Sequence, residues 1–306
     1  MEHLITSKAL AEAIGASESS MRRWTDKGVI RTTRTVGGHR RIAISDAIRF
    51  VRESGTTVVR PDLLGLPDWP ATPEGIEFGS HSLELHLYEA LRTGDAAAAK
   101  GCVAGLFLNG LSVASICDTA MRSAMQRIGE LWQEDPREIL AEHRAMSICI
   151  QSLDLLRQMI GEPARNAPVA LGGAPSDDFY LLPSMMAATV LAESGYRDMN
   201  FGPQTPLGLL AMAAEENKAS IVWLSVKVVS DRSKLRREIV ELAEHIAKLG
   251  IKLVMGGSGV DSLAIRSTKS IHIMQTMTEL AAFARGAVDL QSGQSPAPQD
   301  FRNASK

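Results

Sequence analysis

The sequence predicts a multidomain chain with a small α+β head, a four-helix bundle and an α/β domain built on a doubly wound parallel sheet. A length of 306 residues suits about two or three domains. Hydrophobic residues recur at helical spacing up to residue 160, whereas strands and helices alternate after residue 167. The charge also divides the chain, because residues 1–54 hold ten Lys and Arg against six Asp and Glu, while the rest is net acidic.

Composition narrows the classes of protein that this chain can be. No stretch approaches the ~18 consecutive apolar residues that a membrane span needs, and no secretion signal is visible at the N-terminus. Three widely spaced cysteines form neither a disulfide framework nor a zinc motif, which suits a reducing compartment. We therefore expect a cytoplasmic protein without a membrane partner, whose basic head meets a polyanion.

The first 54 residues are predicted to form short helices and one hairpin. Serines and glycines mark the ends of the helices, and a Gly-Gly pair allows a tight turn. The predicted elements are a helix over Lys8–Ile14 capped by Ser7, a helix over Glu18–Lys27 capped by Ser17, a hairpin that turns at Gly37 and Gly38, and a helix from Ser45 or Asp46 to about Arg52.

Composition and pattern also set the remaining boundaries. Proline and glycine enrichment predicts a linker over 55–77, and helical spacing with little proline predicts the bundle over 78–160. The α/β domain is expected over 167–288, followed by a disordered tail at 289–306. Its predicted strands are Pro168–Gly173, Arg197–Phe201, Ala219–Val226, Ile251–Met255 and Ser270–Ile273.

Two short motifs stand out in the basic head. Residues 22–24 read Arg-Arg-Trp, and residues 37–41 read Gly-Gly-His-Arg-Arg. With these motifs the head resembles the DNA-binding domains of the MerR family over nearly all of its length. The resemblance implies a winged helix-turn-helix that places its second helix in the major groove of double-stranded operator DNA. The expected DNA-contacting residues are Ser19, Ser20, Arg22, Arg23, Arg34, His39, Arg40 and Arg41, with Arg40 and Arg41 on phosphates.

One feature of that family is missing here. Many members dimerise through a long helix directly after the winged domain, but prolines interrupt that position in residues 55–77. We therefore expect a homo-oligomer, a dimer or a tetramer, that assembles through the C-terminal part of the chain.

A third motif lies in the second half of the predicted bundle, where Trp132 is followed after nine residues by Glu142 and His143. An indole face offers a flat wall, and the two polar side chains offer hydrogen bonds. This spacing resembles the cobalamin-binding module of light-sensing CarH/LitR-type repressors, which implies a flavodoxin-like fold over about residues 80–285. The candidate cofactor-binding residues are Trp132, Glu142, His143, Arg144, Phe179, Tyr180, Ser225, Lys227, Gly256 and Gly257, and no metal-ligating residue is expected.

The α/β domain departs from this family at the positions that hold cobalt. The family carries Asp-x-His-x-x-Gly after its first strand, and that His ligates the metal from below. Here Phe179 and Leu182 replace the His and the Gly, Lys227 replaces an apolar residue beside the slot for the nucleotide tail, and Gln133 replaces a His after the cap Trp. Only the glycine pair at 256–257 is intact, so binding through a lower imidazole is not expected.

Three interpretations of the pocket stay open. In the first, which is favoured, the pocket holds a linear bilin such as biliverdin, with its propionates on Lys227 or Arg144 and its rings between Trp132, Phe179 and Tyr180. In the second, it binds adenosylcobalamin without a protein axial His. In the third, the domain is empty and serves protein interaction. Haem ligation by His143 and covalent attachment of a bilin through Cys102, Cys117 or Cys149 are minor variants.

Together these features predict a DNA-binding transcriptional regulator whose C-terminal tetrapyrrole-binding module senses light or a ligand and switches oligomeric state and operator binding. A ligand-free regulator that uses this module for oligomerisation or partner binding is one alternative. A cobalamin-dependent enzyme component is another. We do not expect an enzyme, because the chain lacks the axial His, a P-loop and a dinucleotide-binding glycine motif.

Overall fold

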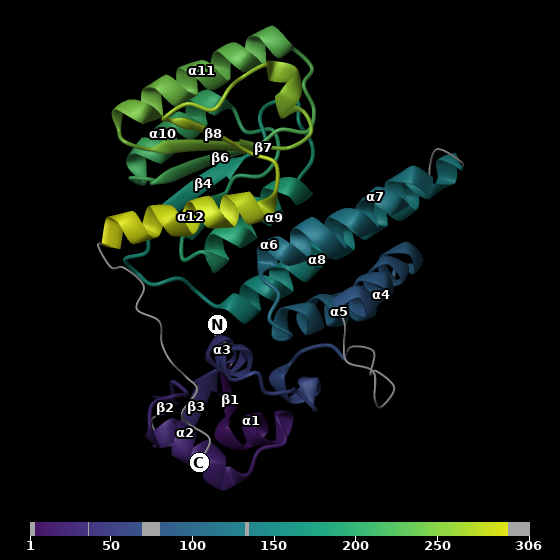
Figure 1. Cartoon of the computed structure of the whole chain (residues 1–306), viewed down its shortest axis with the longest axis vertical. Helices are drawn as coiled ribbons and strands as arrows, with labels where there is room; N and C mark the ends of the chain where they lie inside the picture. Colours follow the sequence, from purple (N-terminus) through teal and green to yellow (C-terminus); the bar gives the residue numbers. More distant parts are fainter. Residues whose placement is uncertain (1–3, 36, 69–79, 132–134, 293–306) are drawn as a thin grey trace.

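The computed structural model describes residues 4–35, 37–68, 80–131 and 135–292. Three parts follow one another: a small head, a helical bundle and an α/β domain (Figure 1). The bundle lies between the head and the α/β domain. None of the helices within these ranges is both long and apolar enough to cross a membrane.

The head combines three helices with a three-stranded antiparallel sheet, in the strand order β1-β3-β2. The second and third strands form the predicted hairpin, and β1 is an addition that the sequence did not reveal. The elements are β1 (Leu4–Thr6), α1 (Ser7–Ala13), α2 (Glu18–Asp26), β2 (Thr33–Arg34), β3 (Arg40–Ala43) and α3 (Ile44–Ser54).

The helix caps of the head agree with the prediction in one case and differ in the other. The Ser17 hydroxyl accepts a hydrogen bond from the N–H of Ser20 at 3.2 Å and caps α2, as predicted. The cap of α1 is Thr6, whose hydroxyl accepts from the N–H of Ala9 at 2.9 Å, so the assignment of Ser7 as the cap was wrong. Thr6 also ends β1, and its pairing with β3 spans a sequence distance that local patterns do not report.

The predicted linker begins too early. The N–H of Val59 donates to the carbonyl of Ala13 at 2.7 Å, and a 3₁₀ helix, η1 (Pro61–Leu64), follows against α1. Leu64 and Leu66 are buried in the same core. Residues up to Leu66 therefore belong to the head, because they cover the apolar side of α1. The rest of the predicted linker, from residue 69, falls outside the described residues.

The bundle contains the four helices that the spacing predicts, but a π-helical turn interrupts one of them. This turn, Cys117–Met121, joins α6 and α7 into one continuous helix. A π turn inserts an extra residue into a helix, and such turns occur often at functional sites. The bundle helices are α4 (Ser80–Thr93), α5 (Ala96–Leu108), α6 (Val113–Ile116), α7 (Arg122–Leu131) and α8 (Ile139–Ile160), with a 3₁₀ turn at Pro136–Glu138.

The α/β domain has a fully parallel five-stranded sheet in the order β5-β4-β6-β7-β8, which confirms the predicted doubly wound, flavodoxin-like arrangement. Helices α9 and α12 cover the face toward the bundle, and α10 and α11 cover the other face (Figure 1). Helix α12 continues to Ser292, which corrects the predicted start of a tail at residue 289. The elements are β4 (Val169–Gly173), α9 (Leu182–Glu193), β5 (Arg197–Asn200), α10 (Leu207–Glu216), β6 (Ile221–Ser225), α11 (Arg232–Lys248), β7 (Lys252–Gly256), a 3₁₀ turn at Val260–Leu263, β8 (Ile271–Met274) and α12 (Met277–Ser292).

Helix α9 is held on the sheet by a buried tryptophan that needs a glycine beside it. Gly172 on β4 pairs with Trp223 on β6, and a Cβ atom on Gly172 would lie 2.1 Å from the Trp223 carbonyl oxygen. The Trp223 indole donates to the Ser184 hydroxyl at 3.3 Å, and that hydroxyl donates to the side-chain oxygen of Asn200 at 2.8 Å. The indole therefore fixes α9 against β6, and Gly172 leaves it the necessary room.

We expect Gly172→Ala to lower the free energy of unfolding by about 3 kcal/mol, because its methyl group would overlap backbone atoms in a packed sheet. Gly208→Ala on α10 is the matched control, since no heavy atom lies within 4 Å of the added Cβ. That change should stabilise the protein by about 0.5–1 kcal/mol. Urea unfolding followed by circular dichroism measures both values, and equal stabilities of the two variants would contradict the packing argument.

Candidate functional site

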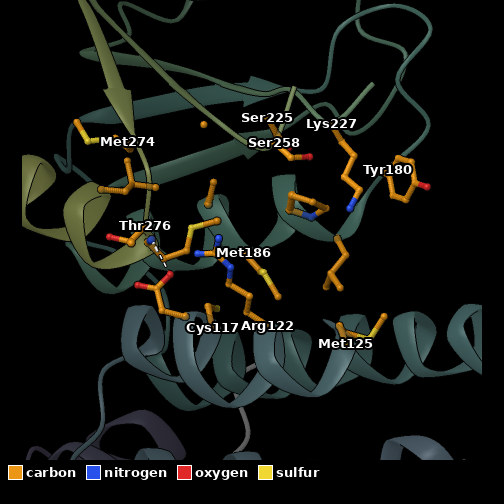
Figure 2. Close-up of a pocket in the computed structure, with 18 of the residues that line it drawn as sticks. Cys117, Arg122, Met125, Tyr180, Met186, Ser225, Lys227, Ser258, Met274 and Thr276 are labelled. Atoms are coloured by element: carbon orange, nitrogen blue, oxygen red, sulfur yellow. Dashed lines mark hydrogen bonds between the residues drawn. The ribbon is translucent and has the colours of Figure 1, made fainter. Parts of the chain in front are cut away.

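A cavity of about 1060 Å³ lies between the bundle and the carboxyl ends of the parallel strands (Figure 2). Ligands of doubly wound proteins bind at this edge of the sheet. The volume is at the upper end of the range of small-molecule pockets, so the cavity suits a large ligand.

The bundle side of the cavity contains two of the predicted cofactor-binding residues. Glu142 and His143, near the start of α8, both line it. Trp132 lies outside the described residues. The π turn belongs to the same wall, so the irregular part of the α6–α7 helix faces the cavity. Further residues of this wall are Cys117, Asp118, Arg122, Met125, Gln126 and Met146.

The sheet side begins with the ends of two neighbouring strands. Ser225 at the end of β6 pairs with Gly256 at the end of β7, and both of these candidate residues line the cavity. Gly257 follows with a φ of +108°, and a Cβ atom there would lie 2.2 Å from the carbonyl oxygen of Val226. Only glycine fits this turn, which explains the Gly-Gly pair in physical terms.

Three predicted residues gather at the cavity from the loops after β4 and β6. Phe179 is 73% exposed although it is large and apolar. The Lys227 ammonium lies 5.1 Å from the centre of the Tyr180 ring, a cation–π distance. Lys227 is exposed, so its charge stays hydrated at the rim instead of entering an apolar slot.

The sequence did not reveal the residue that holds these loops together. Asp178 is 0% exposed, and its carboxylate accepts the N–H groups of Lys227 at 2.6 Å, Val228 at 3.0 Å and Tyr180 at 3.1 Å. Three hydrogen bonds to one carboxylate offset the cost of burying its charge. The only sequence signal is an acidic pair at 177–178, which does not distinguish the buried member from the exposed one.

A second carboxylate, also missed, connects the bundle to the last helix. Asp118 in the π turn accepts the N–H groups of Met277 and Thr278, each at 2.8 Å, and the Thr278 hydroxyl at 2.7 Å. A carboxylate at a helix start satisfies free N–H groups and favours the helix dipole. Asp118 therefore fixes the π turn beside the N-terminus of α12.

Methionines from both sides fill much of the lining. The thioether side chain is unbranched and polarisable, so it adapts to irregular apolar shapes. This composition suits a bulky ligand more than a small polar substrate. The lining methionines are Met125, Met146, Met186, Met255, Met274 and Met277.

The cavity offers little to a metal ion. Among the described residues, no group of three or more His, Cys, Asp and Glu side chains is placed to hold one. His143 supplies the only imidazole of the described lining, and it comes from α8 of the bundle. Burial raises the pKa of the Cys117 thiol far above its usual range, so this lining cysteine stays protonated.

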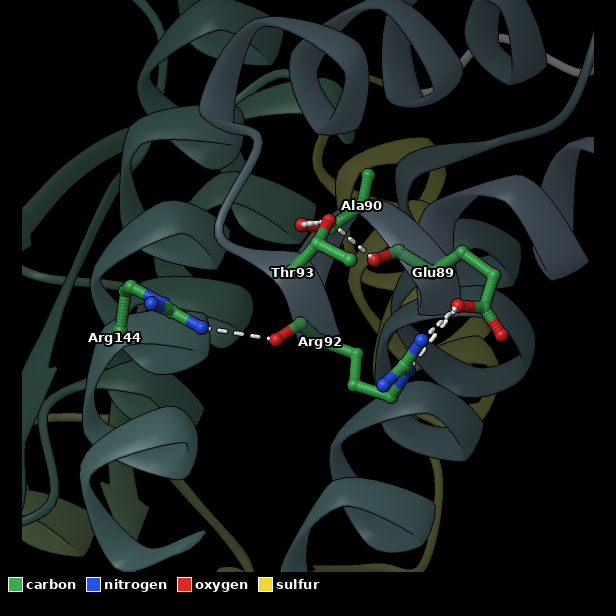
Figure 3. Close-up of polar contacts among 5 residues, drawn as sticks. All are labelled: Glu89, Ala90, Arg92, Thr93 and Arg144. Carbon is green, nitrogen blue, oxygen red and sulfur yellow. Dashed lines mark hydrogen bonds and ion pairs between the residues drawn. The ribbon is translucent and has the colours of Figure 1, made fainter.

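Arg144 does not line the cavity, so its assignment to the cavity was wrong. Its guanidinium donates to the carbonyl oxygen of Arg92 on α4 at 2.9 Å (Figure 3). It also fills the space beside Gly94, where a Cβ atom would lie 2.5 Å from the Arg144 Nε. Adjacent positions of a helix differ by about 100° in direction. Arg144 therefore faces α4 although its neighbour His143 lines the cavity.

In the head, the predicted DNA-contacting residues lie on two neighbouring segments, helix α2 and the β2–β3 hairpin. Both segments lie on the side of the head away from the bundle (Figure 1). The predicted residues that are exposed are Ser19, Arg22, Arg23, Arg34 and His39, and those that are half-buried are Ser20, Arg40 and Arg41.

Arg40 has internal partners that the sequence did not indicate. Its guanidinium forms an ion pair with Asp26 at 2.6 Å and donates to the Thr25 hydroxyl at 2.9 Å. Both partners lie at the end of α2, so Arg40 connects the hairpin to that helix. The Arg40 side chain therefore positions the two segments, and the expected phosphate contact fits Arg41 better.

Part of the chain matches a protein family, and its fold matches a solved protein. Residues 83–157 match the family model described as B12 binding domain. The monomethylamine corrinoid protein of Methanosarcina barkeri has 15% sequence identity and a TM-score of 0.53, over 68% of this chain and 99% of its own. Residues 80–292 therefore have the fold of a cobalamin-binding-type module. No curated protein is similar enough in sequence to match.

Two further solved structures show weaker similarity. A cobalamin-binding protein from Desulfitobacterium hafniense has 14% identity and a TM-score of 0.32, over 69% of this chain and 98% of its own. The methanol:cobalamin methyltransferase complex of Methanosarcina barkeri has 10% identity and a TM-score of 0.34, over 92% and 98%. These similarities are too distant to support an inference.

We expect Asp178→Asn to destabilise the protein by about 2 kcal/mol, because an amide has one acceptor oxygen and its NH₂ group would face N–H donors. Asp177→Asn is the matched control, since Asp177 is exposed and Asn tolerates its φ of +69°. Thermal unfolding by calorimetry compares the two. A loss of stability in Asp177→Asn equal to that in Asp178→Asn would refute the role given to the buried carboxylate.

Proposed function

We propose that this protein is a DNA-binding transcriptional regulator whose C-terminal module binds a tetrapyrrole and senses light or a ligand. The main observation behind the proposal is that one chain combines a basic head with a module of cobalamin-binding type that contains a large cavity. In this proposal, the module also forms the homo-oligomer, and the change in oligomeric state alters the binding of operator DNA.

The shape and charge of the head support DNA binding. Helices α1 and α2 meet at a short turn, and the β2–β3 hairpin lies beside α2, as a winged helix-turn-helix requires. The exposed arginines of α2 and the hairpin provide positive charge for phosphates. Arg40 keeps the hairpin at a fixed place beside α2, so both segments can meet one duplex together.

A cobalamin-type tetrapyrrole is the ligand that we propose for the cavity. The match to a B12 binding domain, the shared fold, the cavity volume and the methionine lining all support it. The residues present do not fit an imidazole bond to the metal from the sheet side, because Phe179 stands there. We therefore propose that the macrocycle is held by apolar contacts and by polar groups such as Ser225 and Glu142 at its edges.

The bilin that the sequence favours receives no support from these similarities. Covalent attachment is disfavoured further, because burial raises the pKa of Cys102 to about 11 and that of Cys149 to about 12. A thiol must ionise to become a good nucleophile. Biliverdin is thus kept as an outcome of the test below and not as part of the proposal.

The module by itself is equally compatible with a component of a corrinoid-dependent enzyme. The solved relative is a corrinoid protein, and its fold says nothing about a DNA target. The basic head favours regulation, because ten Lys and Arg against six Asp and Glu in residues 1–54 contrast with the acidic remainder. A ligand-free regulator is the other alternative, and the cavity volume argues against it.

Arg41→Ala should reduce the slope of log Kd against log salt concentration by about one for a generic DNA duplex, because one phosphate contact is lost. Arg40→Ala should weaken binding and leave this slope nearly unchanged, since Arg40 is paired within the head. Arg49→Ala on α3, whose partner Asp46 is also internal, is the control. Fluorescence anisotropy of the full chain measures all three, and an absence of salt-dependent binding would overturn the regulator proposal.

The full chain purified after supply of hydroxocobalamin should carry a corrinoid absorption spectrum. Cobinamide, which has no nucleotide base, should bind as well. The paramagnetic resonance spectrum of its reduced Co(II) form should show no nitrogen splitting, because Phe179 cannot ligate. Nitrogen splitting would contradict the proposed geometry. A far-red band after supply of biliverdin, with no corrinoid bound, would replace the proposed ligand, and a colourless protein would favour the ligand-free alternative.

A further inference from the structure

Helix α9 connects the cavity to the head. Its first turns contribute Leu182, Pro183, Met186 and Ala187 to the cavity lining. Its last residue, Glu193, lies where the bundle, the α/β domain and the head meet. A helix is stiff along its axis, so a displacement at one end of α9 is carried to the other end.

Glu193 also joins the two walls of the cavity. Its carboxylate accepts the N–H of Val113 at 2.9 Å, and Val113 begins the continuous α6–α7 helix that carries the π turn. The other carboxylate oxygen lies 3.9 Å from the Arg52 guanidinium on α3 of the head. The side chain of Glu193 is 17% exposed and that of Arg52 is 22% exposed, so this ion pair is largely shielded from solvent.

Within the described residues, one nitrogen of Arg52 lacks a hydrogen-bond partner where Arg52 contacts the module. Its guanidinium stacks over the Phe107 ring at 3.6 Å from the centre. One terminal nitrogen, Nη1, is buried and finds no hydrogen-bond partner in the part of the chain that the structure describes. Burial lowers the pKa of Arg52 and raises that of Glu193. A buried donor without a partner costs free energy, so the docked contact is weaker than a fully paired one and a small shift of Glu193 can open it.

The surroundings leave room for such a shift. A second cavity, of about 440 Å³, lies between the head and the module beside Arg52 and Glu193. The head rests on the module through α3, which packs against α5 and α8. Helix α2 and the β2–β3 hairpin lie on the far side (Figure 1). The docked head therefore keeps its proposed DNA-reading side exposed, and the contact controls its orientation.

We infer that Glu193 is the coupling point through which occupancy of the cavity releases the head from the module. A ligand that spreads α9 and the α6–α7 helix moves the carboxylate, which is bonded to both walls, away from Arg52. Release changes where the head of each subunit points, and this alters how several heads engage one operator. This inference rests on the proposed function, because it takes the cavity as the ligand site and the head as the DNA reader.

The test measures the docking of the head directly in the full chain. Spin labels on Lys27→Cys in the head and Glu241→Cys on α11 report the distance by double electron–electron resonance, and both sites are exposed. The native cysteines are buried and react poorly. Glu193→Gln keeps an acceptor for the Val113 N–H but removes the charge. We expect a single narrow distance distribution for the parent and a broad one for Glu193→Gln and for Arg52→Met.

Arg49→Met is the matched control, because Arg49 lies on the same helix and lines the same second cavity but pairs with Asp46 within the head. It should keep the narrow distribution. The double variant of Glu193 and Arg52 should resemble either single one. If Glu193→Gln and Arg49→Met both keep the parent distribution, the coupling role of Glu193 is overturned.

Two arms test the link to the cavity. Hydroxocobalamin should broaden the parent distribution, and by reciprocity Glu193→Gln should bind it about fivefold more tightly. The second arm uses Gly129→Trp and needs no ligand. Gly129 lines the cavity, and no heavy atom lies within 4 Å of an added Cβ, so the introduced indole acts as a wedge between the walls. The Gly129→Trp variant should broaden the distance distribution, whereas Gly129→Ala should not. Failure of cobalamin to bind counts against the proposed ligand alone, while an unchanged distribution in Gly129→Trp counts against the coupling.

Discussion

The cavity depends on carboxylates that accept backbone N–H groups from segments distant in the sequence. Asp178 joins the loops after β4 and β6, Asp118 joins the π turn to α12, and Glu193 joins α9 to α6. Each provides acceptors for N–H groups at the ends of elements, where regular backbone pairing stops. The walls are thus fixed from their ends, and the space between them stays open for a ligand.

The fold of the module and the chemistry of its cavity depend on different residues. The sheet order and the glycine pair at 256–257 follow from backbone geometry, which does not involve residue 179. Phe179 is exposed, and Lys227 lies over Tyr180 at the rim. The side chains of Phe179 and Lys227 therefore affect what the cavity offers to a macrocycle and take no part in the packing of the sheet. Methionines on both sides provide a surface that adapts to a large ring.

Positive charge in the head serves more than one purpose. Arg23 and Arg34 are exposed, and exposed Arg22 lies 3.8 Å from Asp26. Arg40 pairs with the same Asp26 at 2.6 Å, and Arg52 stacks on Phe107. The net charge of residues 1–54 is the same whichever role each arginine has. Only the partners of each guanidinium separate those available to phosphates from those that hold the head together or dock it.

The sequence by itself determined the three parts, the helices of the bundle, the alternating strands and helices, and most positions at the carboxyl edge of the sheet. These features depend on local propensity, on periodic burial and on glycine backbone freedom, which neighbouring residues encode. The tertiary structure decided the cap at Thr6, the packing of residues up to Leu66 and the contact of Arg144 with α4 instead of the cavity. It also decided the roles of Asp118, Asp178 and Glu193. Each of these depends on partners far apart in the chain or on the direction of one side chain. A local pattern shows that a carboxylate or a guanidinium is present, but only the folded chain shows which groups surround it.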